Sequence, residues 1–370
     1  GQAAVIELPY LTEITSIVLD NEEFTAYSFE NGVLTINADA FTAFQIGVKK
    51  FGVTAKNAQG LTVVFEITMT VELVADPVTL EGNREIVLSD ASDYAVDLGE
   101  YAASTVISST FAGENATFAG GKLTITDALK ANKQKHGMQT LKVTVEKGGK
   151  FYTVTIPVTL VTEEIKDLNG LNTALKGEGD EYAIYGYYKL VADLGAANYD
   201  GINNGSSNKN WLNANGEYGF RGTFDGNDKS ISAIIYNSGI FGIVGKGAYI
   251  KNLTVNSYKY SNGRTILART ITEATIENVT INVISGSSDS YYAEGGVITA
   301  LLSHSSKYIN VKIKSSSDLD TLFGKSFGNY KAEKANTFEN CVVNAKSLAG
   351  LVHSNEIISA AGIDGLTIPQ

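Results

Sequence analysis

From Ile231 onward the chain repeats one short pattern of apolar and polar positions. The pattern has six positions, which read apolar, any, Asn or small, apolar, any, apolar. A second, shorter apolar segment lies between successive copies, and polar stretches of variable length join the two. The copies are Ile231–Tyr236, Ile250–Val255, Ile276–Ile281, Tyr308–Ile313, Phe338–Val343 and Ile363–Ile368.

The spacing of these copies predicts a parallel β-helix. Their third positions follow one another at steps of 19, 26, 32, 30 and 25 residues. Two short β-branched strands per period indicate a solenoid whose coils pair with their neighbours, and they are too short for paired helices. The absence of proline between Pro157 and Pro369 fits this prediction, since an inner strand must donate hydrogen bonds to the next coil.

Asparagine occupies the third position in most copies, and we expect these residues to stack at one corner of the coil. Such a stack forms a structural amide ladder in which each side chain bonds to the next coil. Side-chain amides without a carboxylate cluster are weak metal ligands, so we expect neither a metal nor a cofactor. The ladder residues are Asn252, Asn278, Asn310 and Asn340.

The amino-terminal part of the chain contains an internal duplication with an offset of 89 to 90 residues. Alternating strands and short turns in each copy predict two tandem β-sandwiches, at 1–75 and 76–162. The first copy is short at its start. Helical turns are expected around Asp39–Phe44 and Asp127–Lys135, with Asp127 as N-cap of the second. The matched segments are Gly32–Ile36 with Gly121–Ile125 and Phe65–Val71 with Val154–Leu160.

Helical spacing follows the second copy. Ile165, Leu168, Leu171 and Leu175 predict an amphipathic helix with Thr162 as N-cap, which ends at Gly177. A helix at this place covers the open edge of the sheet that follows. The predicted fold is therefore all-β: two tandem immunoglobulin-like β-sandwiches, followed over 163–370 by a right-handed parallel β-helix with an N-terminal helical cap.

Two resemblances suggest a biological setting. Tyr188–Leu194, Trp211, Phe220–Asn227 and Gly239–Gly242 together resemble the start of β-helix domains of the GLUG-motif type, which occur in bacterial cell-surface and adhesin-like proteins. The likeness covers 163–370, although its glycine-bracketed element decays in later coils. It implies that Trp211 packs within the cap.

The two amino-terminal copies resemble the immunoglobulin-like modules of bacterial surface proteins. Together the resemblances imply an extracellular protein at the bacterial cell surface, with an export signal or lipid anchor before Gly1 and the first two domains as spacers.

The net charge and the composition disfavour some classes of ligand and of protein. A net charge of −11 and a pI near 4.9 disfavour nucleic acid and anionic membranes as ligands. The chain holds no run of about 18 apolar residues, so we expect no integral membrane protein. Cys341 is the single cysteine, which excludes an intrachain disulfide, and its apolar position predicts a buried thiol.

A catalytic role has few candidates. Asp225 and Asp228 flank Gly226-Asn227, but this sequence is first of all a turn signature. A polysaccharide lyase or glycosidase needs a carboxylate pair across a groove, or a carboxylate-bound calcium with a base. We expect no catalytic residue, and a glycan-cleaving β-helix enzyme stays as the alternative.

Tyrosine is concentrated in the predicted β-helix, where 14 of the 19 tyrosines lie. Exposed rings with a polar tip bind sugars and protein partners. We expect adhesion or binding of an extracellular glycan or a host or cell-surface protein, without catalysis; a purely structural surface role is a third possibility. The candidate ligand residues are Tyr258, Tyr260, Tyr291 and Tyr292.

Overall fold

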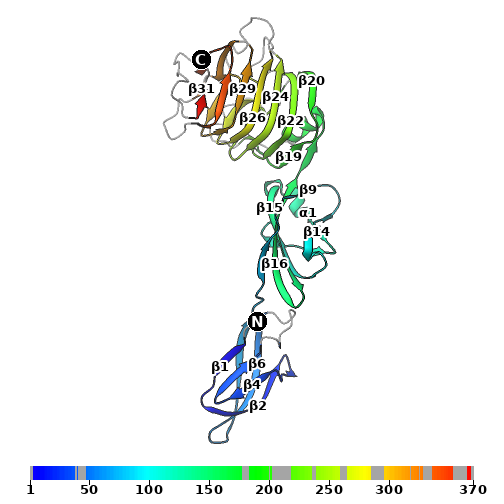
Figure 1. Cartoon of the computed structure of the whole chain (residues 1–370), viewed down its shortest axis with the longest axis vertical. Coiled ribbons are helices and arrows are strands. Elements are labelled where there is room, and N and C mark those ends of the chain that lie inside the picture. The colour runs from blue at the N-terminus through cyan, green and yellow to red at the C-terminus, as the bar shows by residue number, and fades with distance from the viewer. Residues whose placement is uncertain are drawn as a thin grey trace. The chain divides into compact units, whose positions relative to one another are not determined.

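The computed structural model shows a predominantly β protein, so the predicted all-β class is confirmed (Figure 1). Its α-helices, among the described residues, are α1 (Asp127–Ala131) and α2 (Leu168–Lys176). The predicted turn at Asp39–Phe44, apart from Ala40, and Trp211 lie outside the described residues. The structure describes residues 3–37, 40, 47–176, 183–199, 201, 218–235, 239–258, 265–284, 296–316, 318–324, 326–327, 336–352 and 365–367.

Residue contacts divide the chain into two compact units. The first consists of 1–82, 95–123 and 141–156, and the second of 83–94, 124–140 and 157–370. The boundaries predicted near residues 75 and 162 remain predictions.

The start of the first unit consists of two antiparallel sheets that share one core. Buried side chains of both sheets, including Leu34, Ile36, Ile17 and Phe51, pack together. Alternation of apolar and polar residues directs one face of each strand to this core. The sheets have the orders β1-β5-β4 and β3-β2-β6-β7. Their strands are β1 (Ala4–Glu7), β2 (Leu11–Leu19), β3 (Glu22–Glu23), β4 (Tyr27–Glu30), β5 (Val33–Ile36), β6 (Gly47–Asn57) and β7 (Thr62–Val71).

The next sheets are also mainly antiparallel. One has the order β12-β11-β15-β16-β8, with β9 also on β16, and another the order β10-β14-β13. Strands β8 and β9 run parallel to β16, whereas β15 runs antiparallel to β11. The strands are β8 (Asp76–Thr79), β9 (Arg84–Val87), β10 (Asp93–Ala95), β11 (Thr105–Phe111), β12 (Glu114–Asn115), β13 (Phe118–Ala119), β14 (Lys122–Thr124), β15 (Gly137–Lys147) and β16 (Lys150–Val161).

In the second unit two parallel sheets are built by strands that alternate along the chain. The larger has the order β17-β19-β22-β24-β26-β29-β33-β35, with β20 on β22 and β28 on β26 and β32. We call it the large parallel sheet, and its central strands lie side by side in Figure 1. Its strands are β17 (Glu163–Ile165), β19 (Tyr187–Leu190), β20 (Leu194–Tyr199), β22 (Thr223–Ile235), β24 (Tyr249–Tyr258), β26 (Thr275–Ile284), β28 (Lys307–Ile309), β29 (Lys312–Ser315), β32 (Thr337–Glu339), β33 (Cys341–Asn344) and β35 (Leu366–Thr367).

A smaller parallel sheet alternates with it in the order β18-β21-β23-β25-β27-β31, and β30 pairs with β34 in a third. After each passage through the smaller sheet the chain returns to the large sheet one strand farther on. We call one such passage, together with the segment of the large sheet that follows it, a coil. The strands are β18 (Ala183–Ile184), β21 (Gly219–Phe220), β23 (Ile243–Val244), β25 (Ala268–Thr272), β27 (Thr299–His304), β30 (Asp318–Phe323), β31 (Ser326–Phe327) and β34 (Ser347–Val352).

From Ile250 onward the six-residue pattern lies in the large parallel sheet and aligns from coil to coil. The predicted first copy at Ile231–Tyr236 is wrong in register, because Phe224 pairs with Ile250 whereas Ile231 pairs with Val255. Leu253 pairs with Val279 and Val255 with Ile281, and all four are buried in one continuous core. Polar residues between them point outward, because side chains alternate across a strand. The alternation within each strand therefore sets which side chains face outward.

The cap begins later than the sequence predicts. Residues 163–165 form β17, which pairs with β19, so the expected helix start at Thr162 is wrong. Strand pairing with the first coil outweighs the helical spacing there. The α2 helix starts at Leu168, and the Asp167 carboxylate accepts the N–H of Gly170 at 2.8 Å. In α1 the N-cap is Thr126 rather than Asp127, and its hydroxyl accepts the N–H of Leu129.

His136 ties α1 to the start of the first coil. Its Nε2 lies 3.2 Å from the carbonyl of Leu129 and its Nδ1 2.8 Å from the hydroxyl of Thr162. A carbonyl only accepts, so Nε2 carries the proton and Nδ1 accepts from Thr162. That hydroxyl also accepts the N–H of Tyr187 at 2.8 Å. Burial lowers the pKa of His136, against the raising effect of backbone hydrogen bonds.

We expect stability to fall as pH drops through the ordinary histidine pKa of about 6.5. The folded pKa is depressed, so the unfolded chain binds the proton first and acid favours unfolding. Thermal unfolding of the wild type and His136→Gln from pH 7.5 to 5 measures this effect. The wild-type midpoint should fall more than that of the variant over the same range. Parallel curves would show that His136 does not carry the dependence.

Candidate binding face of the large parallel sheet

The outward face of the large parallel sheet carries two rows of polar side chains before the asparagine corner. Because parallel strands align residue by residue, each row crosses successive coils about 4.8 Å apart. The second row alternates in charge. The rows are Tyr187, Thr223, Tyr249 and Thr275, and Lys189, Asp225, Lys251 and Glu277.

Asp225 is the centre of this face, and it is only 8% exposed. Its carboxylate accepts the Tyr187 hydroxyl at 2.7 Å, the Asn227 N–H at 2.9 Å and the Asn252 amide at 3.1 Å. The Lys251 ammonium lies 3.0 Å away. Burial opposes ionisation, but these hydrogen bonds and the lysine outweigh it and hold the pKa of Asp225 below its ordinary value.

Two tyrosines flank Lys251. Its ammonium lies 5.6 Å from the ring centre of Tyr187 and 5.7 Å from that of Tyr249, within range of cation–π attraction. Tyr249 donates its hydroxyl to Glu277. Burial, followed by this carboxylate, raises the pKa of Tyr249 to about 12. We call Tyr187, Asp225, Tyr249, Lys251 and Glu277 the tyrosine–lysine cluster.

Asp225 is unsuited to act as a general acid. A general acid has to hold its proton near neutral pH, whereas the pKa of Asp225 is lowered. Asp225 and Glu277 lie on strands separated by β24, and Lys251 stands between them. Asp228 is exposed within β22 and has a φ of 58°, at the place where the pairing register with β24 shifts. These charges are arranged to neutralise one another.

The asparagine corner forms a chain of amide hydrogen bonds. Asn278 donates to Asn252 at 3.2 Å, and Asn310 donates to Asn278 at 3.0 Å. Asn252 in turn donates to Asp225, so a carboxylate is the last acceptor of the chain. Asn252, Asn278, Asn310 and Asn340 all have φ between 51° and 54°, a left-handed conformation that asparagine tolerates.

A further polar row lies on the same sheet after the corner. Asn256 donates to the Ser232 hydroxyl at 2.9 Å, and Asn282 donates to Asn256 at 2.8 Å. Thr254 and Thr280 lie beside them, facing the same way. We call Ser232, Thr254, Asn256, Thr280 and Asn282 the amide face. Its side chains are partly exposed and offer both donors and acceptors.

The predicted tyrosine face is largely outside the described residues. Tyr260, Tyr291 and Tyr292 lie there, and for Tyr258 only the backbone is described, as the last residue of β24. In the described part of the large parallel sheet, Tyr187 and Tyr249 lie on either side of Lys251. The sequence carries a signal for the neighbouring charged row, because the second position of the pattern holds Lys251 and then Glu277, residues of opposite charge on adjacent strands.

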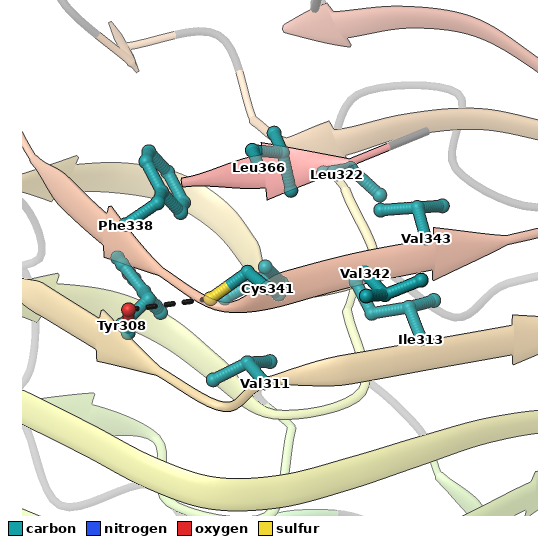
Figure 2. Close-up of a pocket in the computed structure, with 10 residues that line it drawn as sticks. Tyr308, Val311, Ile313, Leu322, Phe338, Cys341, Val342, Val343 and Leu366 are labelled. Atoms are coloured by element: carbon teal, nitrogen blue, oxygen red, sulfur yellow. Dashed lines mark hydrogen bonds between the residues drawn. The ribbon is translucent and has the colours of Figure 1, made fainter. Parts of the chain in front are cut away.

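A small apolar cavity, with a volume of about 10 Å³, lies within the last coils (Figure 2). Tyr308 and Phe338 stack at its edge with ring centres 5.2 Å apart. The buried Cys341 thiol donates to the carbonyl of Tyr308 at 3.2 Å, and burial raises its pKa. The lining is continuous with the coil core and aims no charged group inward, so the cavity is a gap in packing.

Comparison with known proteins gives no family: no family model matches the sequence, and no curated protein is similar to it. Within the described part of the chain, no group of His, Cys, Asp and Glu side chains is placed to hold a metal ion. None of the helices described is both long and apolar enough to span a bilayer.

Proposed function

We propose that the large and small parallel sheets form a right-handed parallel β-helix, capped by α2. The alternation of strands between the sheets and the amide chain at the corner support this architecture. We further propose that residues 1–75 and 76–162 are immunoglobulin-like spacers. The antiparallel sheets with a shared core in the first of them support this assignment.

We propose that the protein is a non-catalytic adhesin that binds an extracellular glycan at the bacterial surface. The observation that carries the proposal is the outward face of the large parallel sheet, where tyrosine, hydroxyl and amide groups stand in aligned rows. Sugar hydroxyls both donate and accept, which suits side-chain amides and hydroxyls. The Tyr249 ring offers an apolar surface with a polar edge.

The charges of the tyrosine–lysine cluster favour binding over cleavage. Asp225 and Glu277 already hold partners, so neither carboxylate is free to move a proton to a bound sugar. A rigid face of preformed hydrogen-bonding groups needs little reordering when a ligand arrives.

A glycan array with Tyr249 variants tests this function. We expect Tyr249→Ala to weaken binding about tenfold, the equivalent of about 1.4 kcal/mol, while Tyr249→Phe keeps the ring and most of the affinity. Tyr10→Ala, at an 85% exposed tyrosine of the first unit, serves as the matched control and should bind like the wild type.

Three outcomes of that experiment count against the proposal. Silence of the wild type across the array favours a purely structural surface protein. Equal binding by Tyr249→Ala and the wild type removes this face from the site. Product formation in a parallel turnover assay on polysaccharides supports the glycan-cleaving alternative.

A further inference from the structure

Two exposed lysines lie beside the amide face, whose own residues are all uncharged. Lys312 and Lys314 lie on β29, next to Thr280 and Asn282 of the preceding coil. The intervening Ile313 is buried, so both lysines point outward about 6.6 Å apart. Neither holds an ion pair or side-chain hydrogen bond among the described residues.

The residues that pair with these lysines on the two adjacent strands carry no charge. On the following strand, β33, Lys312 pairs with Val342 and Lys314 with Asn344. The nearest carboxylates in the aligned rows, Glu277 and Glu339, precede the asparagine corner. Unlike Lys251, which has Asp225 beside it, Lys312 and Lys314 have no aligned carboxylate in the adjacent coils that the structure describes.

This unbalanced pair stands out because the chain as a whole carries a net charge of −11. Exposed charges interact over about 8 Å at physiological ionic strength, so the local pair decides which ligand groups approach it. Lysines beside amides and a threonine hydroxyl combine an anion-binding charge with groups that suit sugar hydroxyls.

We propose that Lys312 and Lys314 bind the carboxylates of an acidic polysaccharide that lies across the amide face. The inference rests on the proposed glycan binding and names its ligand class. A thin chain with one charge per sugar meets the two lysines while its hydroxyl groups contact Thr280, Asn282 and Asn344. A nucleic acid duplex or an anionic lipid surface presents a broader charged area, which the acidic remainder of the protein repels.

Binding of polygalacturonate and of its fully methyl-esterified form tests the proposal. The two polymers share a backbone and differ in charge. The variant is Lys312→Gln with Lys314→Gln, and the control is Lys122→Gln with Lys142→Gln, which changes net charge equally at exposed lysines of the first unit. An unchanged melting temperature shows that both variants fold.

We expect the wild type and the control to prefer the charged polymer, and the Lys312/Lys314 variant to bind it roughly tenfold more weakly. That loss corresponds to two exposed ion pairs of about 0.7 kcal/mol each. Affinity for the esterified polymer should be the same in all three proteins. Raised salt should weaken the wild type toward the level of the variant.

The results that would overturn this inference alone differ from those that would also overturn the proposed function. Binding of neutral glycans on an array, with no preference for polygalacturonate or no effect of the two substitutions, overturns this inference and leaves the proposed function standing. The absence of binding to any glycan overturns both. Retention on anionic lipid vesicles, without binding to polygalacturonate, also overturns the inference.

Discussion

Replacing Asp225 with alanine is expected to destabilise the first coils by about 3 kcal/mol. The carboxylate receives the Tyr187 hydroxyl, the Asn252 amide, the Asn227 N–H and the Lys251 ammonium. Its removal leaves these donors without their acceptor in a largely buried place, and it removes the last acceptor of the amide chain. Urea unfolding followed by circular dichroism measures the loss.

Asp225→Asn is the matched variant, because asparagine keeps the shape and one acceptor oxygen. We expect it to lose about half as much as alanine, since the charge on Lys251 stays unbalanced while the hydrogen bonds are partly kept. Hydrogen exchange of β22 and β24 should rise in the alanine variant first. Equal stability of Asp225→Ala and the wild type would contradict the central place of this carboxylate.

Replacing Gly226 with alanine is expected to cost about 2–4 kcal/mol through steric conflict. A Cβ at this position would meet the carbonyl oxygen of Asn252 and lie 2.7 Å from the Cα of Leu253. Both are backbone atoms of the next coil, so the strands would have to separate. The thermal midpoint should fall, and exchange protection should be lost in β22 and β24.

Gly195→Ala is the control for that substitution. Gly195 lies in the same sheet, in β20, and a Cβ there would find its nearest atom, the Ser232 carbonyl oxygen, at an ordinary 3.8 Å. This variant should unfold like the wild type. A loss of similar size in both variants would indicate a general intolerance of alanine rather than the close approach of two coils.

The repeat made much of the second unit predictable. Apolar positions at fixed intervals have to be buried, and a six-residue pattern leaves room for one short strand on each side of a bend. Asparagine at the third position fits the left-handed corner because its short side chain tolerates that backbone. These are local requirements, so they are visible in the sequence.

The start of the cap shows where local reasoning fails. Glu163, Glu164 and Ile165 fit a helix by spacing, yet they pair with Tyr188, Lys189 and Leu190. A strand edge offered by the first coil satisfies backbone groups that a helix end would leave open. Helix preference is a weak bias of a fraction of a kcal/mol per residue, and long-range pairing overrides it.

The sequence predicted only the local part of the role of Asp225. The turn signature around it is local, and Asn227 does bond back to its carboxylate. Its other partners, Tyr187, Lys251 and Asn252, come from two neighbouring coils 26 to 38 residues away. Because the intervals between coils vary, the sequence could not show which side chains align.

The sequence by itself determined the all-β class and the positions that face the core, because burial of apolar residues follows their periodicity. Tertiary structure alone decided which polar residues meet outside the core. Strand register joins Tyr187, Asp225 and Lys251 into one cluster and leaves Lys312 and Lys314 unbalanced. Register depends on the lengths of the connecting segments and on pairing between distant strands, and a pattern read along one chain does not contain either.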